Sequence, residues 1–177
     1  KIKQVAAILA AESLRVWKDM KFESWVDLKA AIREIELGVR LPSPAEAAAA
    51  RKITGDNPPN NFRKTEDIYA RETVFLARDY QPSTKIVVQA LRLGALGIGT
   101  FPGEAFCELG LDVKKNSPTS ATMIVELANG YHGYIPTQEA HAEGGYETWR
   151  AKSSFLAPDA APRMVAAVIA NLQSIAS

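Results

Sequence analysis

"ALGIGTFPGEAFCELGLDVKKNSPTSATMIVELA", residues 95–128, decides the fold of this chain, because a strand, a helix and a second strand follow one another within it. An apolar run at 95–101 predicts a short strand, which Pro102-Gly103 ends. Apolar residues at helical spacing follow at 105–115, and residues 121–131 predict another strand. This order is that of a crossover unit. We therefore expect these two strands to be part of one sheet.

Helices and strands alternate along the rest of the chain as well. Helices are predicted at residues 3–18, 43–53, 65–80 and 161–175, and strands at residues 32–42 and 84–94. The clearest helix start is Ser43, which Pro44 follows and which has Glu46 three residues later, as in a capping box. A tight connection around Gly94 joins two successive strands. The pattern predicts an α/β or α+β fold, a mixed β-sheet flanked by helices.

The bulk composition is that of one globular domain. The chain has 177 residues, of which 47% are hydrophobic and 23% are charged, and its formal net charge is +1. Such a balanced charge gives no indication of nucleic acid as a partner. No apolar run approaches the roughly 20 residues of a membrane span, and no signal peptide is recognisable. The chain begins at Lys1 in the middle of a helical pattern, so we expect a fragment or a processed chain.

Cys107 is the single cysteine of the chain, which excludes an internal disulfide. It lies within an apolar helical pattern. Because free cysteine is among the most buried residue types, we expect its thiol to pack in the core.

Polar side chains follow both strands of the 95–128 stretch at the point where each strand ends. Glu104 comes just after the first strand, and Tyr131 and Tyr134 come just after the second. In open α/β sheets, site residues gather at the carboxyl ends of the strands. The two strand ends are therefore expected to face one crevice.

The stretch "LANGYHGYIPTQEAHAEGGYE", residues 127–147, has the most unusual composition in the chain. It contains four glycines, three tyrosines, two histidines and three acidic residues. Loops of this kind often serve binding. A long connection whose aromatic side chains plug the surface beneath it would have the same composition, so the residues alone leave both interpretations open.

A family resemblance sharpens this interpretation. "FPGE" after a β-hairpin, followed by "NGYHGYIPTQEA" and "GGYE", resembles the C-terminal half of the catalytic domain of neutral ceramidases (neutral/alkaline non-lysosomal ceramidases). "IYARE", "VVQALRLGALGIGTFPGEAF" and "GLDVKKNSP" are similar to bacterial members in the same order. The resemblance extends over most of residues 30–175. It implies that residues 1–177 are one portion of a larger catalytic domain.

The resemblance also implies a chemistry. Neutral ceramidases are zinc-dependent amidohydrolases that cleave ceramide to sphingosine and a fatty acid, with two histidines, a glutamate and a tyrosine around the zinc. Glu104 and Tyr134 match the glutamate and the tyrosine, and Tyr146 matches a tyrosine that stabilises the transition state. Zinc accepts such ligands and can lower the pKa of a bound water toward about 7. A ceramide-like lipid amide is the implied substrate, and an extracytoplasmic location is implied as well.

The two zinc histidines of the family come from an upstream segment that this chain does not contain. We therefore expect the upstream half of the same domain as a partner, and the isolated chain to be inactive. His132 and His141 are expected not to be ligands. Glu126 interrupts an apolar strand for no reason that the sequence supplies.

Other interpretations of the same residues stay open. Glu104 would also suit the N-terminus of a helix, Tyr134 could fill space under the loop, and Tyr146 could be an ordinary surface or core aromatic. Tyr131 is expected to pack rather than to take part in chemistry. A metal hydrolase that acts on a non-lipid amide, or a noncatalytic module that retains the scaffold, would have the same sequence features.

Overall fold

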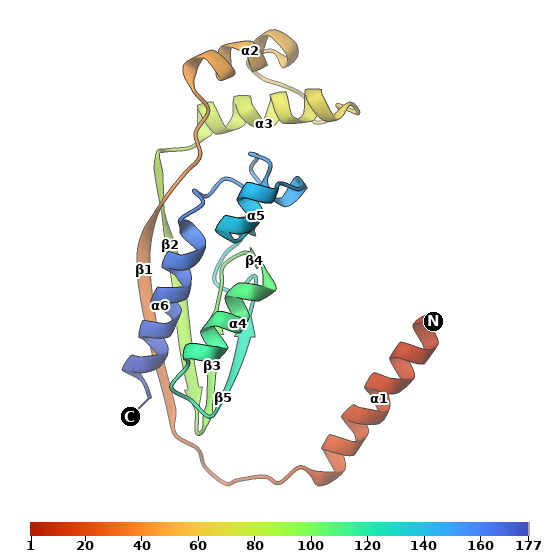
Figure 1. The fold of residues 1–177 in the computed structure, drawn as a ribbon, viewed down its shortest axis with the longest axis vertical. Helices are drawn as coiled ribbons and strands as arrows, with labels where there is room; N and C mark the ends of the chain where they lie inside the picture. The colour runs from red at the N-terminus through yellow and green to blue at the C-terminus, as the bar shows by residue number, and fades with distance from the viewer. Residues whose placement is uncertain (177) are drawn as a thin grey trace.

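A mixed four-stranded sheet with helices on one face forms the body of the molecule (Figure 1), in a computed structural model that describes residues 1–176. The strands are β1 (Leu28–Gly38), β2 (Ser83–Leu93), β3 (Leu96–Thr100) and β5 (Ala121–Val125), and their order in the sheet is β1-β2-β3-β5. The first three are antiparallel neighbours, whereas β3 and β5 are parallel. The predicted fold class and the crossover between β3 and β5 are thereby confirmed.

Two short strands, β4 (Glu104–Ala105) and β6 (Tyr134–Ile135), form a second, parallel pair. The helices are α1 (Ile2–Asp19), α2 (Pro44–Thr54), α3 (Thr65–Asp79), α4 (Cys107–Asn116), α5 (Gln138–Glu143) and α6 (Ala160–Ser174), with a 3₁₀ turn at Tyr146–Thr148. Each predicted helix is present with its ends within two residues of the expected positions, whereas α5 lies in a stretch for which no helix was predicted.

Two strand predictions have the wrong bounds. β1 begins four residues before the predicted start and ends at Gly38, because the chain then changes partner. The amides of Val39 and Arg40 donate to Pro82 O and Phe155 O at 2.9 and 2.7 Å. The strand predicted to reach residue 131 ends at Val125. Leu127 and Asn129 adopt positive φ values of 53° and 67°, which an extended strand cannot accommodate.

The core lies between the sheet and helices α4 and α6, which cover the same face (Figure 1). Glycines in β3 let α6 approach closely. A Cβ atom at Gly99 would lie 2.6 Å from Val168 Cγ1, and one at Gly97 would lie 3.0 Å from Leu172 Cδ2. The sequence "GIG" in β3 therefore sets the distance between the sheet and α6. This packing also positions the end of β3, just beyond which Glu104 lies.

Cys107 contradicts the expectation of a buried thiol, because its side chain is exposed. Leu109 and Val113 form the buried face of α4. Cys107 precedes Leu109 by two residues, which is about 200° around a helix, so its thiol points away from the core. It lies 3.4 Å from the carboxylate of Glu108.

Helices α2 and α3 form a hairpin beyond one end of the sheet (Figure 1). The predicted capping box at the start of α2 is confirmed. The Ser43 amide donates to Glu46 Oε2 at 2.7 Å, and the Glu46 amide donates to Ser43 Oγ at 3.2 Å. Glu46 also pairs with Arg150 at 2.7 Å, which ties α2 to the loop that follows the 3₁₀ turn.

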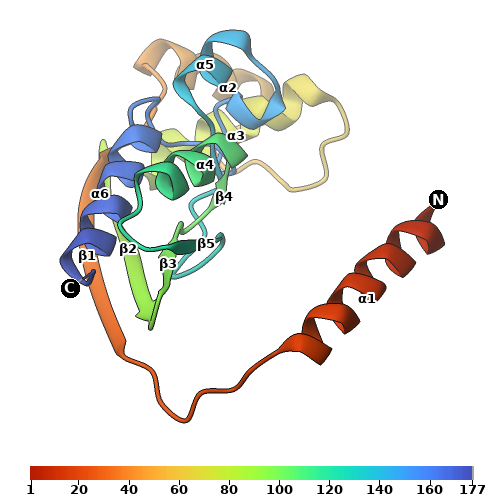
Figure 2. The same ribbon diagram turned by 60° about the horizontal axis from the view of Figure 1, so that its bottom comes forward.

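Helix α1 stands apart from the body (Figures 1 and 2), and none of its residues is buried. Among residues 1–176, no helix combines the length and the apolar character that crossing a membrane would require.

Candidate active site

Glu104 and Tyr134 occupy opposing positions in the parallel pair of β4 and β6. The Glu104 amide donates to Gly133 O at 2.9 Å, and the Phe106 amide donates to Ile135 O at 3.2 Å. Side chains at opposing positions of paired strands project from the same face. The structure thus brings the carboxylate of Glu104 and the phenol of Tyr134 to one face, just beyond the ends of β3 and β5.

Glycines make this pairing sterically feasible. A Cβ at Gly133 would lie 2.4 Å from Ser153 O, and φ is +74° there, so this position requires glycine. A Cβ at Gly103 would lie 2.5 Å from Gly133 O. The Tyr134 amide then donates to Ser153 O at 2.8 Å, which fixes β6 from its other side. The glycines allow three backbone segments to meet where Glu104 and Tyr134 are held.

Tyr131 contributes an unexpected contact, with the carboxylate of Glu104. Its hydroxyl donates to Glu104 Oε1 at 3.2 Å, and 60% of its surface is exposed. The expectation that Tyr131 is a packing residue is therefore wrong. Partial burial and then the bond to Glu104 raise the pKa of Tyr131. Its place three residues before Tyr134 in a glycine-spaced repeat was the only available signal.

Tyr146 lies against Tyr134. Their rings meet edge to face, with centroids 5.6 Å apart and planes at 88°. The contact with Tyr134, followed by the charge of Tyr134 and that of Glu147, raises the pKa of Tyr146 to about 12. The phenol of Tyr146 is therefore neutral throughout the ordinary pH range and able to donate a hydrogen bond.

A fourth tyrosine completes the cluster, so that four of the five tyrosines of the chain meet here. Burial, then the carboxylate of Glu72, then Tyr134 raise the pKa of Tyr69. The Tyr69 ring packs edge to face on Trp149 with centroids 5.1 Å apart. Because Tyr69 comes from α3, far away in sequence, no local pattern could have predicted its presence.

Glu126 also has a structural explanation. Partial burial, followed by the negative charge of Glu104, raises its pKa, and the backbone of Ala105 opposes this rise. The carboxyl of Glu126, just after β5, therefore lies near Glu104 and the backbone of β4.

The two histidines of the glycine-rich stretch lie in different surroundings, His132 beside the backbone of Pro102 and His141 near Arg40. His132 Nδ1 lies 3.1 Å from Pro102 O, and its amide donates to the same oxygen at 2.8 Å. Burial, and then the positive charge of Arg40, lower the pKa of His141. Within residues 1–176, no three His, Cys, Asp or Glu side chains are grouped so as to hold a metal ion.

Arg40 stabilises the backbone that holds the site residues. No sequence pattern predicted this role. Its guanidinium donates to the carbonyl oxygens of Thr148, Ser154 and Leu156 at 2.7, 2.6 and 2.9 Å. These three acceptors belong to the segment against which β6 is held. One cation from the end of β1 therefore fixes the loop that carries Tyr146 and the backbone that binds Tyr134.

The donor set fits part of a cation site. A carboxylate and a phenol are oxygen donors that a divalent cation such as zinc accepts, and zinc in proteins usually has four ligands. Glu104 and Tyr134 could hold two of these positions, with Tyr131 orienting the carboxylate. In the described part of the chain, neither residue belongs to a group of three His, Cys, Asp or Glu side chains that could hold a metal ion.

A pocket of about 400 Å³ adjoins Tyr131. Its lining includes Tyr69 and three charged residues, Arg71, Glu72 and Lys152. Glu72 is buried and pairs with Arg71 at 2.9 Å, and it accepts a hydrogen bond from the Lys152 amide at 3.0 Å. This pocket is the space beside the candidate site in which a substrate group could lie.

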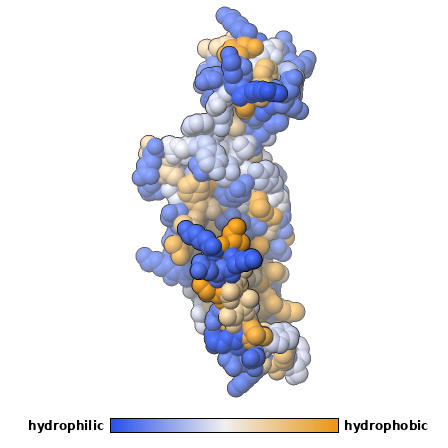
Figure 3. Space-filling view, turned by 90° about the vertical axis from the view of Figure 1, so that its right-hand side faces the viewer, coloured by the Kyte–Doolittle hydropathy of each residue, from blue (hydrophilic) through white to orange (hydrophobic). Residues whose placement is uncertain are grey.

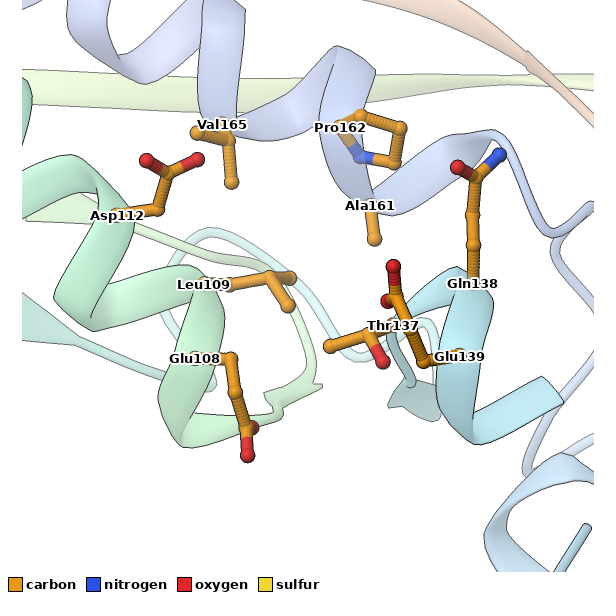
Figure 4. A pocket seen from close by; sticks show the side chains of 9 residues that line it. All are labelled: Glu108, Leu109, Asp112, Thr137, Gln138, Glu139, Ala161, Pro162 and Val165. Carbon is orange, nitrogen blue, oxygen red and sulfur yellow. The ribbon is translucent and has the colours of Figure 1, made fainter. Parts of the chain in front are cut away.

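A second pocket, of about 290 Å³, lies between α4, α5 and α6 (Figure 4). Leu109, Val165 and Pro162 line it, and the carboxyl groups of Asp112 and Glu139 also border it. None of the candidate site residues belongs to its lining, so it is not where the cluster of tyrosines could act.

Solved structures of ceramidases share this fold. The neutral ceramidase from Pseudomonas aeruginosa is similar with a TM-score of 0.58 and 14% sequence identity, over 85% of this chain and 28% of that one. A ceramidase complexed with C2 is similar with a TM-score of 0.54 and 13% identity, over 84% of this chain and 30% of that one. The chain therefore spans less than a third of the length of either.

No protein-family model matches the sequence, and neither does any curated protein. At identities this low, the likeness is one of fold. The predicted resemblance to neutral ceramidases thus holds for the architecture.

Proposed function

We propose that residues 1–177 form the C-terminal portion of the catalytic domain of a zinc-dependent amide hydrolase of the neutral ceramidase type. The observation that carries the proposal is the in-register pairing of Glu104 with Tyr134 at the ends of two parallel strands, with Tyr146 against Tyr134. The ceramidase-like fold supports it.

Each residue of the cluster has a role in this proposal. Glu104 and Tyr134 hold the cation, and the Tyr131 hydroxyl keeps the Glu104 carboxylate in one orientation. Tyr146 donates its proton in a hydrogen bond to the carbonyl oxygen of the amide as that oxygen gains negative charge. One such donor is typically worth about 3 kcal/mol in transition-state stabilisation. A pKa of about 12 keeps this proton in place at working pH.

When bound, zinc supplies a water whose pKa falls to about 7 and a positive charge beside the amide carbonyl. Two further ligands, which we expect to be histidines, come from the upstream half of the same domain. The 177-residue chain alone is therefore inactive in this proposal.

The proposed substrate is N-acylsphingosine, which hydrolysis converts to sphingosine and a fatty acid. The substrate class rests on the ceramidases that share the fold. A non-lipid amide is the second candidate, because charged side chains, Arg71, Glu72 and Lys152, line the pocket beside Tyr131. A panel of acyl amides with alkyl and with polar amine portions separates the two.

The test measures the release of fatty acid from a labelled short-chain ceramide by the complete gene product loaded with zinc. Glu104→Gln and Tyr134→Phe should each abolish release while the thermal unfolding midpoint stays close to that of the parent. Glu108→Gln is the matched control, because it removes an exposed carboxylate in α4 and should leave the rate unchanged.

Full activity in both the Glu104 and the Tyr134 variants would refute the ligand assignment. Hydrolysis of polar amides in preference to ceramide would support Glu104 and Tyr134 as ligands but would make a non-lipid amide the substrate. Complete inactivity with every amide, with or without zinc, would favour a noncatalytic module that has retained the scaffold.

A further inference from the structure

Glu72 in α3 is the only charged residue that is buried within residues 1–176. Hydrophilic residues cover most of the surface at the end of the molecule that α2 and α3 form (Figure 3), so a charged side chain on these helices is ordinarily exposed. A buried carboxylate is costly unless it is paired and hydrogen-bonded. The contacts that bury Glu72 all belong to this chain, so a larger domain around them would leave it buried.

The two oxygens of the Glu72 carboxylate have different partners. Arg71 donates from Nε and Nη2 to Oε1 at 3.2 and 2.9 Å, so a guanidinium balances the charge. Oε2 accepts a hydrogen bond from the Lys152 amide at 3.0 Å, 80 residues further along the chain. Hydrogen bonds from a backbone amide to an ionised carboxylate are stronger than those between neutral groups. Glu72 therefore ties α3 to the backbone of a distant segment.

Lys152 belongs to a tight turn beside the candidate site. The Ala151 amide donates to Ser154 O at 3.2 Å, and the Ser154 amide donates to Ala151 O at 2.9 Å, which closes the turn at both ends. Lys152 and Ser153 are the two residues between them. Ser153 O accepts the hydrogen bond of the Tyr134 amide at 2.8 Å. One short turn thus connects the buried carboxylate of α3 with the backbone of Tyr134.

The 151–154 turn is held on its other side as well. The Arg40 guanidinium donates to Ser154 O at 2.6 Å and to Ser154 Oγ at 2.9 Å. The turn also packs closely on β6, since a Cβ atom at Gly133 would lie 2.4 Å from Ser153 O. A displacement of the turn therefore changes the position of β6, and with it that of the candidate ligand in β6.

We propose that Glu72 is a positioning residue of the candidate site, which fixes Tyr134 opposite Glu104 through the 151–154 turn. In this role it does not touch the reacting atoms. The importance of this position for catalysis rests on the proposed function, in which Tyr134 holds a cation. How firmly the backbone of Tyr134 is held can be measured without any activity.

Two variants separate the hydrogen bond of Glu72 from its charge. Glu72→Gln and Glu72→Met both remove the negative charge opposite Arg71, and both keep a side chain of similar length. Only glutamine retains an oxygen that can accept a hydrogen bond from the Lys152 amide. A difference between the two variants therefore reports the acceptor and not the ion pair.

Amide hydrogen exchange of the complete gene product, resolved by mass spectrometry with fragmentation, measures the effect on Tyr134. In Glu72→Met, the Tyr134 amide should exchange roughly tenfold faster than in the parent, beyond any change in the amides of β2, which report global stability. In Glu72→Gln, it should exchange as in the parent by the same comparison. Glu66→Met is the control, because Glu66 is an exposed carboxylate of the same helix, and it should alter neither.

Hydrolysis of the labelled ceramide by the same preparations tests the consequence. Glu72→Met should lower kcat by roughly tenfold to a hundredfold with a smaller change in KM, and Glu72→Gln should keep kcat within roughly fivefold of the parent. A kcat of Glu72→Met equal to that of the parent would overturn the proposal.

Equal exchange of the Tyr134 amide in the two Glu72 variants would also overturn it, because the acceptor would then have no effect. So would equal losses of kcat in both variants with the exchange of the parent, because Glu72 would then act on the substrate in the pocket beside Tyr131. If the parent hydrolyses no amide, the proposed function fails, and the exchange rates alone decide whether Glu72 positions Tyr134.

Discussion

The hydroxyl of Tyr146 is the most strongly perturbed phenol of the site, and Tyr134 is the main cause. The contact with Tyr134 is the largest single cause of the rise of its pKa to about 12. Tyr134→Phe should therefore return the pKa of Tyr146 toward the ordinary value of about 10. An alkaline titration followed by tyrosinate absorbance measures this. Tyr146→Phe should remove the latest transition altogether.

Tyr131→Phe is the control for that titration, because Tyr131 is not among the causes of the Tyr146 shift. The same latest transition should persist in this variant. If Tyr134→Phe left the transition at its original pH, the contact between Tyr134 and Tyr146 would not be the one described here.

Tyr131 itself should act through Glu104 rather than on the substrate. Removing its hydroxyl deletes one hydrogen bond at 3.2 Å, for which a net loss of about 0.5–1.5 kcal/mol is typical. In an active preparation, Tyr131→Phe should lower kcat/KM by up to roughly tenfold. A loss as complete as that of Glu104→Gln would mean that Tyr131 contacts the reacting atoms.

At the scale of elements, the close approach of β3 and α6 depends on Gly99. Gly99→Ala would force a Cβ atom to within 2.6 Å of Val168 Cγ1. Overpacking of this kind typically costs about 1–3 kcal/mol of stability. Urea denaturation should show that loss.

Gly110→Ala in α4 is the opposite case and serves as the matched substitution. Its new Cβ would lie 3.6 Å from Ile124 Cγ1, an ordinary contact, and the position is inside a helix. Alanine there should stabilise the chain by about 0.5–1 kcal/mol. Equal effects of the two substitutions would mean that the sheet and α6 are not packed as described.

The capping box of α2 predicts a pH-dependent contribution. Glu46 has a pKa lowered to about 2, first by its bond to Arg150 and then by Ser43. A carboxyl whose folded pKa is lowered stabilises the fold above its ordinary pKa of 4.5 and loses that contribution as pH falls toward 2. Because the Glu46 side chain is 50% exposed, Glu46→Gln should cost only about 0.5–1 kcal/mol at neutral pH.

Urea denaturation of parent and variant at several pH values measures the difference in the free energy of unfolding. The difference should disappear in the interval between 4.5 and about 2, where the parent carboxyl becomes neutral. A difference that stays constant through this interval would show that the charge of Glu46 contributes nothing.

Local chemistry explains how much of the elements could be predicted. The start of α2 could be predicted because three helix-start signals, Ser43, Pro44 and Glu46, occur within four residues. The end of β1 was not, because it depends on the amide of Arg40 meeting Phe155 O, more than a hundred residues away. The prediction of a buried Cys107 was wrong. An apolar helical pattern shows that one face of the helix is buried, but it does not fix the direction in which the side chain of the first residue points.

At the scale of the whole molecule, the crossover between β3 and β5 decides where the candidate site lies. It was predictable, since parallel neighbours need a helical connection and "PGE" marks the end of the first strand. After β3 and β5 end, the chain forms one further short strand from each, β4 and β6, and these two strands pair Glu104 with Tyr134. What the sequence could not supply is the convergence of Tyr69 and Arg40 from distant elements, because nothing local encodes a tertiary contact.

Helix α1 illustrates the same limit. Its helical period was evident, but periodicity cannot tell what its exposed apolar residues pack against. Only the position of α1 away from the body raises that question (Figure 1).

The most direct test of the central claim is anomalous diffraction at the zinc edge from crystals of the complete gene product grown with zinc. The expected result is a peak about 2.0–2.2 Å from oxygens of both Glu104 and Tyr134, with Tyr146 alongside. A peak bound elsewhere, with the Glu104 carboxylate and the Tyr134 hydroxyl turned toward solvent, would contradict the account.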